Sequence, residues 1–467
     1  MAMPSTWVRE RLRHIRLTPF DQSTENGRSD ERLRRLGLSA GATALSRVLA
    51  LLVTIASIPL ALGYLGKERF GVWSTLSALV VALQFADLGI GNGVINAVST
   101  AHGKGDALRL RQHVSTAFFS LLAIGCVLAG VAFSIIPLIS WSELFHLRDP
   151  LAAREVLPAV LAFAICFALS VPLSLVQRVQ IGLQSGFIAS GWQCVANALS
   201  LLAIWACARS QLGLAWMVVA LLGAPLVASF INSAIFFWRH DSRYRPDWKL
   251  IKKDSLHLLM RVGGGFLVLQ ISVAIVFSSD AIIIAKVLGA SEVMNYSVPE
   301  KLFSIISLII ATSIMPLWPA YGEALARGDV SWITRTLRRS ATMAAMFALI
   351  SALLLVMAAP KLIALWVGDK VVVGLPLLLS MALWRILEGT GFAFGMFLNG
   401  CGIIRFQVIS SCLMAFCAIA LKPMLVSKIG IAGAPLVTAV VYLALTLVPL
   451  AFLLRGMVLK LQSGISA

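Results

Sequence analysis

The sequence contains a series of long apolar stretches, each about 20 to 28 residues, separated by short polar loops. A helix of this length crosses the hydrocarbon core of a bilayer, whereas a membrane β-strand needs only about ten residues of alternating polarity. The class predicted is therefore an all-α membrane protein with about 12 transmembrane helices. We place the spans at 38–62, 71–98, 113–139, 155–180, 186–208, 212–238, 262–288, 294–320, 333–358, 371–397, 403–426 and 429–455.

The composition agrees with a surface that faces lipid. Charged residues make up 13% of the chain, against about 25% in a soluble globular domain. The net charge of +18 first suggests a nucleic-acid partner, but the basic residues are spread over short loops between apolar spans, so we exclude that partner. Residues 1–36 are polar and rich in arginine and lack the apolar core of a signal peptide. Within them, the segment 7–17 is expected either to lie on the inner membrane face as a short basic helix or to form an unstructured tail.

The distribution of Lys and Arg predicts the orientation of the chain. With twelve spans, roughly 26 of the 39 basic residues fall on the side that holds both termini, and roughly 10 fall on the other side. Lys422 is counted with the second group. Because basic residues concentrate in cytoplasmic loops, both ends are predicted to be cytoplasmic.

Short matches indicate an internal repeat. Leu65-Gly66 recurs as Leu288-Gly289, and Gly105-Asp106 recurs as Gly328-Asp329, both at an offset of about 223 residues; a later echo joins 212–215 to 429–432. Two six-helix lobes of like orientation around a central cavity are typical of transporters, although a duplicated scaffold without transport is an alternative. We divide the chain into a basic N-terminal tail (1–36), an N-lobe (37–238), a basic linker (239–257), a C-lobe (258–456) and a C-terminal tail (457–467).

Ionisable residues within or at the ends of the spans are the candidate site. A charge at the bilayer centre costs roughly 2.5–3.5 kcal/mol, so each one suggests function. From their depths we expect Arg47 to pair with Asp87 and Asp280 to pair with Lys301, whereas Arg385 and Glu388 share a helix face. The residues either line a water-filled cavity or neutralise one another inside the bundle. The set comprises the cations Arg47, Arg178, Lys301 and Arg385 and the acids Asp87, Asp280, Glu300 and Glu388.

Other chemistry finds no support in the sequence. The seven cysteines lie in or at the ends of apolar spans, and neither they nor the six histidines have metal-ligand spacing, so no metal is expected. Gly89, Gly91 and Gly93 lie in a predicted helix and not after a strand, which favours close helix packing or a kink over a nucleotide site. The same holds for Gly263–Gly265. Intramembrane amides such as Gln180 and Asn197 are expected mainly to hydrogen-bond between helices. No nucleotide-binding P-loop motif is present, and no cofactor is expected.

Several short motifs of the first half occur in a fixed order: Leu65-Gly66, Phe70-Gly71, Asp87-Leu88-Gly89 and Gly103-Lys104-Gly105-Asp106. A segment of the second half, Ser278–Leu302, has an aspartate before an isoleucine run, a leucine-glycine and a tyrosine-serine. With these motifs the sequence resembles the bacterial Wzx-type O-antigen flippases, a family within the multidrug/oligosaccharidyl-lipid/polysaccharide exporter superfamily. The resemblance covers about residues 36–455.

The resemblance implies a function without covalent chemistry. Members move an oligosaccharide linked to undecaprenyl diphosphate from the inner to the outer leaflet of the bacterial cytoplasmic membrane, and a coupling H+ or Na+ is an expected partner. Arg385, as the deepest cation, is the first candidate to hold the diphosphate, followed by Arg47, Lys301 and Arg178. Asp87, Asp280, Glu300 or Glu388 would take up the coupling ion or serve only to pair with these cations. Membrane lipids and other polysaccharide assembly proteins are further candidate partners.

Two alternatives remain open at this stage. The first is a drug or organic-cation antiporter of the same superfamily. The second is a membrane glycosyltransferase or polysaccharide polymerase, which would need acidic or histidine residues in a large periplasmic loop. The longest outer loop predicted here has about 15 residues, which disfavours the enzyme.

Overall fold

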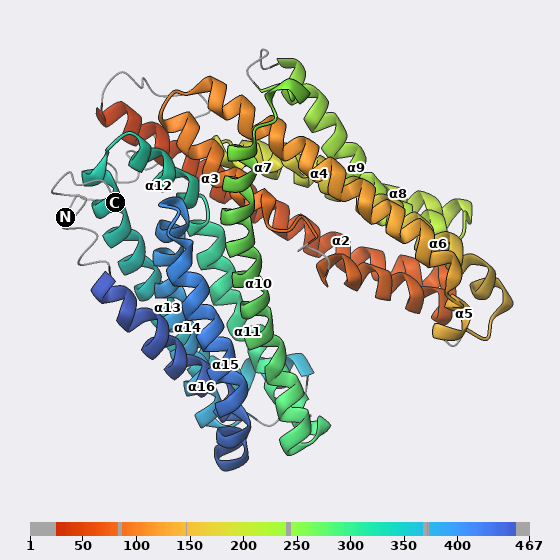
Figure 1. Cartoon of the computed structure of the whole chain (residues 1–467). Helices are drawn as coiled ribbons and strands as arrows, with labels where there is room; N and C mark the ends of the chain where they lie inside the picture. Colours follow the sequence, from red (N-terminus) through yellow and green to blue (C-terminus); the bar gives the residue numbers. More distant parts are fainter. Residues whose placement is uncertain are drawn as a thin grey trace, which may run out of the picture. The chain divides into compact units, whose positions relative to one another are not determined.

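A computed structural model of the chain describes residues 25–82, 86–145, 147–239, 244–367, 371 and 373–453. These residues form helices joined by short turns, with no strand among them (Figure 1). The predicted all-α class is therefore confirmed. The chain divides into two compact units, unit 1 ending at Gly264 and unit 2 beginning at Gly265. The predicted basic segment 7–17 and the C-terminal tail lie outside the described residues.

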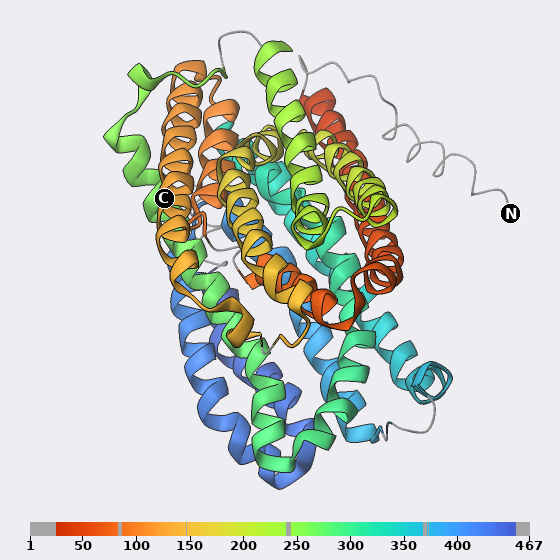
Figure 2. The ribbon, with the colours of Figure 1, turned by 90° about the vertical axis from the view of Figure 1, so that its right-hand side faces the viewer.

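Unit 1 is built around long helices that pack in sequence along one another. Helix α2 packs against α8, α8 against α9, α9 against α6, and α6 against α4 (Figures 1 and 2). Helix α3 packs against both α4 and α7. The elements are α2 (Glu25–Ala82), α3 (Ile90–Gly103), α4 (Ala107–Ile135), η1 (Ile136–Leu138), α5 (Trp141–Leu144), α6 (Pro150–Leu173), α7 (Leu175–Gly182), α8 (Gly186–Ser210), α9 (Leu214–Arg239) and η2 (Trp248–Leu250).

Unit 2 is organised around α14, which packs against α11, α12, α13 and α16. In the most apolar 18-residue stretch of α14, 56% of the residues are buried, whereas the share in α13 is 17%. Helix α14 is therefore the core helix of this unit. Helix α10 begins in unit 1 and continues into unit 2. The elements are α10 (Lys253–Leu288), α11 (Ala290–Ile314), α12 (Leu317–Ala326), α13 (Val330–Val367), α14 (Leu375–Gly400), α15 (Ile404–Ile429), η4 (Gly430–Ala432), α16 (Gly433–Tyr442) and the π-helical turn η5 (Leu443–Leu447).

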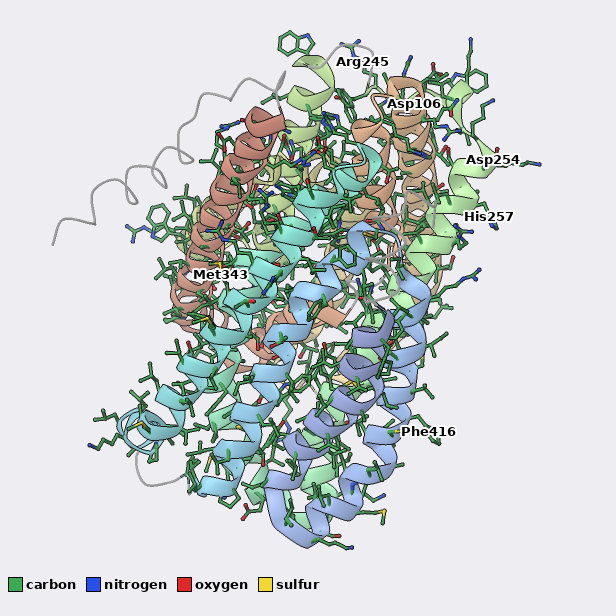
Figure 3. The ribbon with its side chains drawn as sticks, turned by 90° about the vertical axis from the view of Figure 1, so that its left-hand side faces the viewer. Asp106, Arg245, Asp254, His257, Met343 and Phe416 are labelled. Carbon is green, nitrogen blue, oxygen red and sulfur yellow. The ribbon has the colours of Figure 1, made fainter. Side chains whose placement is uncertain are left out.

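The helices account for the twelve predicted spans. Among the described residues, ten helical stretches are long and apolar enough to cross a membrane. One of them, Ile404–Leu453, turns at Gly430 and contains the last two predicted spans. The predicted span 71–98 is not among the ten because its helix is interrupted. Exposed apolar side chains cover the outside of these helices: Phe416 on α15 points away from unit 2 and is 74% exposed (Figure 3).

The first helix begins earlier than expected. Helix α2 begins at Glu25, so the last part of the predicted basic tail, residues 25–36, is helical. The reason is local charge pairing, because the carboxylate of Glu31 is 2.7 Å from Arg34 Nη2 and 2.8 Å from Arg35 Nε. Arg35 also donates to the carbonyl of Leu183 at 3.3 Å, which attaches this polar extension of α2 to the end of α7.

The second predicted span is broken near its middle. Leu88 and Gly89 have φ of 53° and 75°, and the carboxylate of Asp87 accepts hydrogen bonds from the amides of Gly89 and Gly91 at 2.9 and 3.2 Å. Helix α3 therefore begins at Ile90. The prediction that Gly89 lies within a helix is wrong, because Gly89 lies at the helix start. A Cβ on Gly89 would lie 2.0 Å from the carbonyl oxygen of Gly263. Close packing, one of the two expected roles of these glycines, is confirmed here.

The internal repeat is visible in the backbone of each unit. Gly105 and Gly328 have φ of 69° and 75°. Around Gly105 the amide of residue 104 bonds to the carbonyl of 100, 105 to 102, 106 to 101 and 107 to 105, and around Gly328 the equivalent bonds recur at the predicted offset. A further pair, not anticipated, is Gln184 and Gly402, with φ of 57° and 72°. The turns repeat even where the residue types do not.

Candidate functional site

The candidate site in unit 2 begins with two neighbouring helices. Helix α11 places Tyr296, Glu300 and Ser307 at spacings of four and seven residues, so they share one face. Helix α14 places Arg385 and Glu388 three residues apart, as the sequence predicted. Since α11 packs against α14, the two polar faces meet inside unit 2.

Arg385 is the centre of this contact. Its guanidinium donates through Nη1 to Glu388 Oε2 at 2.6 Å and to Ser307 Oγ at 2.9 Å, and through Nη2 to Glu300 Oε1. The Ser307 hydroxyl in turn donates to Glu388 Oε2 at 2.5 Å. The side chain of Arg385 is 4% exposed, whereas those of Glu300 and Glu388 are 29% and 24% exposed. The arginine is thus enclosed, and its two carboxylate partners remain accessible.

A third ion pair lies in the same unit. Lys422 of α15 is fully buried, and its Nζ is 2.5 Å from Asp280 Oδ1 of α10 and donates to the carbonyl of Val276 at 2.7 Å. Asp280 also accepts a 2.6 Å hydrogen bond from the hydroxyl of Tyr296. The predicted pairing of Asp280 with Lys301 is therefore wrong. Lys301 is exposed and forms no ion pair within the part of the chain that the structure describes.

The Lys422–Asp280 pair and the two ion pairs of Arg385 meet on α11. Tyr296, which bonds to Asp280, lies one helical turn before Glu300, which pairs with Arg385. The connected cluster holds three carboxylates and two cations. Its formal charge is negative by one, so a single bound proton or monovalent cation would neutralise it. We call this set the unit 2 charge cluster: Asp280, Glu300, Arg385, Glu388 and Lys422.

The candidates in unit 1 are less enclosed. Arg178 of α7 donates to the amide oxygen of Asn92 at 3.3 Å. Arg178 Nε and Asp87 Oδ2 both lie within 3 Å of the point that a Cβ of Gly91 would occupy. Arg47 of α2 is half-buried and forms no ion pair among the described residues, so its predicted pairing with Asp87 is wrong. Asp87 instead uses both carboxylate oxygens to cap the interrupted α3.

Three intramembrane amides in unit 1 bond between helices. Gln180 and Asn232 exchange two hydrogen bonds, at 2.8 and 3.1 Å, and both are buried. The amide of Asn197 donates to the carbonyl of Ser46 at 3.1 Å. For these residues the predicted role in helix association is confirmed.

Two cavities border the unit 2 charge cluster. One, of about 310 Å³, lies among α10, α14, α15 and α16, and its walls include the aromatic rings of Phe277, Trp384 and Tyr442. The other, of about 380 Å³, lies along α11 and α14 and includes Ser307. Glu388 lines both. Its carboxylate is therefore the member of the cluster that solutes in either cavity can reach.

Three residues of the unit 2 site were not among the predicted site residues: Lys422 of the charge cluster, and Tyr296 and Ser307, which hydrogen-bond to it. The sequence does carry a signal for Lys422, because this residue falls inside the predicted span 403–426 although the charge distribution assigns it to the outer side. Tyr296 and Ser307 have no such signal, because hydroxyl residues are common in membrane helices. Within the described residues, no group of His, Cys, Asp or Glu side chains could hold a metal ion.

Comparison with known proteins gives sequence relatives and a fold. The sequence profile of the family described as "Polysaccharide biosynthesis protein" matches residues 37–325. A Salmonella typhi protein named "Putative O-antigen transporter" is 24% identical over 294 residues, which make up 62% of this chain and 66% of that protein. A protein of the same name from Salmonella typhimurium is 24% identical over 307 residues, covering 61% and 64%. The chain thus spans slightly less than two thirds of the length of these relatives.

Solved structures resemble this chain over nearly its whole length. A MATE transporter in the bent conformation has a TM-score of 0.78 at 15% identity, with 93% of this chain and 97% of that chain covered. A multidrug resistance MATE family transporter in an outward-facing conformation has a TM-score of 0.76 at 14% identity, covering 92% and 96%. At such low identity the likeness establishes the fold.

Proposed function

Because the chain belongs to the polysaccharide biosynthesis protein family, we propose that it carries a lipid-linked oligosaccharide across the bacterial cytoplasmic membrane. The cargo proposed is a polysaccharide repeat unit on undecaprenyl diphosphate, moved from the cytoplasmic to the periplasmic leaflet. The family match carries the proposal, and the names of the two Salmonella relatives support it. Two units with a repeated topology also suit alternating access, in which a cargo is exposed first to one side and then to the other.

The movement is proposed to be coupled to an ion held by the unit 2 charge cluster. The surplus negative charge among groups that lie in membrane-spanning helices supports this proposal. Such a charge is costly in a bilayer unless a proton or a cation compensates it. Glu388 is the proposed acceptor because it lines both cavities.

This arrangement gives Arg385 an indirect role in binding. With Glu300 and Glu388 ionised, its guanidinium is occupied by two carboxylates. Protonation of Glu388 or binding of a cation beside it would weaken one of those bonds and free donors for an anionic group such as a diphosphate. The three less enclosed cations, Arg47, Arg178 and Lys301, are the proposed first contacts of the diphosphate.

The coupling is tested by Glu388→Gln in purified protein reconstituted into vesicles. The variant is expected to keep its place in the membrane but to lose the acceleration of transport by an imposed H+ or Na+ gradient. Glu292→Gln is the matched control, because the Glu292 carboxylate on the same unit accepts a 3.0 Å bond from the side-chain amide of Asn295 and lines neither of the two cavities. An unchanged gradient response in Glu388→Gln would remove Glu388 from the coupling site.

The cargo is tested by deleting the gene and following the lipid-linked glycan. Loss of transport should cause the undecaprenyl-linked repeat unit to accumulate on the cytoplasmic side, where mass spectrometry identifies it. Normal delivery to the periplasm, in a strain without a redundant carrier, would exclude the proposal.

One observation favours a second candidate, an organic-cation antiporter. The 310 Å³ cavity combines aromatic walls with the carboxylate of Glu388, and aromatic faces attract organic cations. This function predicts efflux of organic cations from vesicles in exchange for H+ or Na+, and no effect of gene loss on lipid-linked glycans.

A further inference from the structure

The segment between α9 and α10 has a composition that the transport proposal does not use. Residues 244–253 read YRPDWKLIKK, with four basic residues, one acid and the apolar residues Trp248, Leu250 and Ile251. We call this segment the linker foot. It belongs to unit 1. The distribution of basic residues predicts that it lies on the cytoplasmic side of the membrane.

Hydrogen bonds fix the linker foot to α4 and α9. The amide of Asp247 donates to Ser115 Oγ at 3.1 Å, and the amide of Lys252 donates to Thr116 Oγ1 at 3.2 Å. Arg111 donates to the carbonyl of Arg245 at 3.1 Å and to the carboxylate of Asp247 at 3.4 Å. Bonds along its length hold the segment in one conformation.

The partners on α9 extend this attachment. Arg245 Nε donates to the carbonyl of Phe237 at 2.8 Å. The ring of Tyr244 lies 5.5 Å from that of Phe236. The foot is therefore anchored to both α4 and α9.

The anchor points lie at the level where the apolar spans begin and end. Ser115 and Thr116 are in the first turn of the span predicted at 113–139, and Phe237 is in the last turn of the span predicted at 212–238. Ser115 is about 12 Å along α4 from its first residue. Hydropathy and hydrogen bonding thus independently place the foot at the boundary between hydrocarbon and headgroups.

The side chains that the foot leaves exposed suit this level. Trp248 is 69% exposed and Ile251 is 45% exposed. Lys249, Lys252 and Lys253 are exposed beside them, and Lys249 Nζ lies 5.8 Å from the centre of the Trp248 ring. The one acid, Asp247, is paired with Arg111. The exposed face is therefore cationic and aromatic, and Figure 3 shows Arg245 at the same end of unit 1 as Asp106 of the α3–α4 turn.

We propose that the linker foot binds anionic phospholipid headgroups of the cytoplasmic leaflet. Tryptophan is favoured at the headgroup level of a bilayer, and lysines near an anionic surface are each stabilised by about 1 kcal/mol. The three lysines bind the phosphate groups, while Trp248 and Ile251 insert among the upper acyl carbons. Because α10 begins at Lys253 and continues into unit 2, bound lipid fixes the start of the helix that connects the units.

The test measures the unfolding temperature of the full chain, purified in a neutral detergent, as lipid is added. Phosphatidylglycerol should raise this temperature, because a ligand of the native state stabilises it, and phosphatidylcholine with the same acyl chains should not. A variant with Lys249, Lys252 and Lys253 all changed to Gln should need at least about tenfold more phosphatidylglycerol for half of the shift, since each lysine contributes roughly fivefold. Changing the same three residues to Arg should retain the response.

The control is a variant in which Arg335, Arg338 and Arg339 are all changed to Gln. These residues are exposed on α13 of unit 2, and the variant loses the same positive charge as the lysine variant. It should keep the wild-type response. Trp248→Ala, which retains all the charges, should weaken the effect of phosphatidylglycerol. The proposal is overturned if the lysine variant responds like the wild type. It is also overturned if glycerol phosphate, which has no acyl chains, gives the same shift. None of these readouts depends on transport.

Discussion

The buried pair of Lys422 and Asp280 offers a quantitative test of how unit 2 is stabilised. Lys422→Met keeps most of the volume of the side chain but removes the ammonium that lies 2.5 Å from Asp280. Among the described residues, the carboxylate then retains only the bond from Tyr296 in an enclosed site. Breaking a buried pair by removing one partner costs about 3–5 kcal/mol. For a unit of this size, that corresponds to a lowering of the unfolding temperature by about 6–20 °C.

The assay is thermal unfolding of purified variants in one detergent. Lys428→Met is the matched control, because Lys428 is exposed near the end of the same helix, and it should unfold within about 2 °C of the wild type. The double variant Lys422→Met with Asp280→Asn should recover more than half of the loss, since no charge is then left unpaired. An unchanged unfolding temperature in Lys422→Met, or a double variant no more stable than the single one, would refute the reasoning.

Further predictions concern packing, backbone and transport. Gly263→Ala should lower the unfolding temperature, since its Cβ would lie 2.7 Å from the backbone of Gly89. Gly264→Ala is the control, because a Cβ on Gly264 meets nothing within 4 Å. Equal effects of the two substitutions would contradict the close approach of Gly263 to Gly89. Gly402→Ala should cost about 1 kcal/mol of stability without any clash, because φ is 72° there, and a neutral result would show that the turn adjusts. Arg385→Ala should abolish transport while the protein stays in the membrane; normal transport would remove Arg385 from the mechanism.

The helical fold follows from the sequence because each span carries its own signal. Twenty apolar residues have few alternatives in a bilayer, so the all-α class and about twelve spans could be predicted, and both are confirmed. The family, predicted from short motifs, is confirmed by the match over residues 37–325. Helix ends and interruptions are harder, since they depend on particular contacts. The start of α2 at Glu25 depends on pairing around Glu31. The break before α3 depends on Asp87 capping and on the approach of Gly263.

The candidate site could be predicted only where partners share a helix. Arg385 and Glu388 are three residues apart, and the periodicity of a helix brings them together. The pairings between helices failed because depth in the membrane does not define which face a residue occupies. Asp280 and Lys301 have similar predicted depths, yet Lys301 is exposed and Asp280 pairs with Lys422 of another helix. Sequence spacing cannot determine the rotation of one helix against its neighbours.

The most direct test of the proposed function is transport by the purified chain. The protein would be reconstituted into vesicles containing an undecaprenyl-diphosphate-linked oligosaccharide, and an enzyme or lectin outside the vesicles would report which leaflet exposes the glycan. The account predicts protein-dependent movement of the glycan between leaflets, lost in Arg385→Ala. Vesicles with the wild-type chain that translocate the lipid no faster than empty vesicles, with H+ and Na+ gradients each imposed, would contradict it.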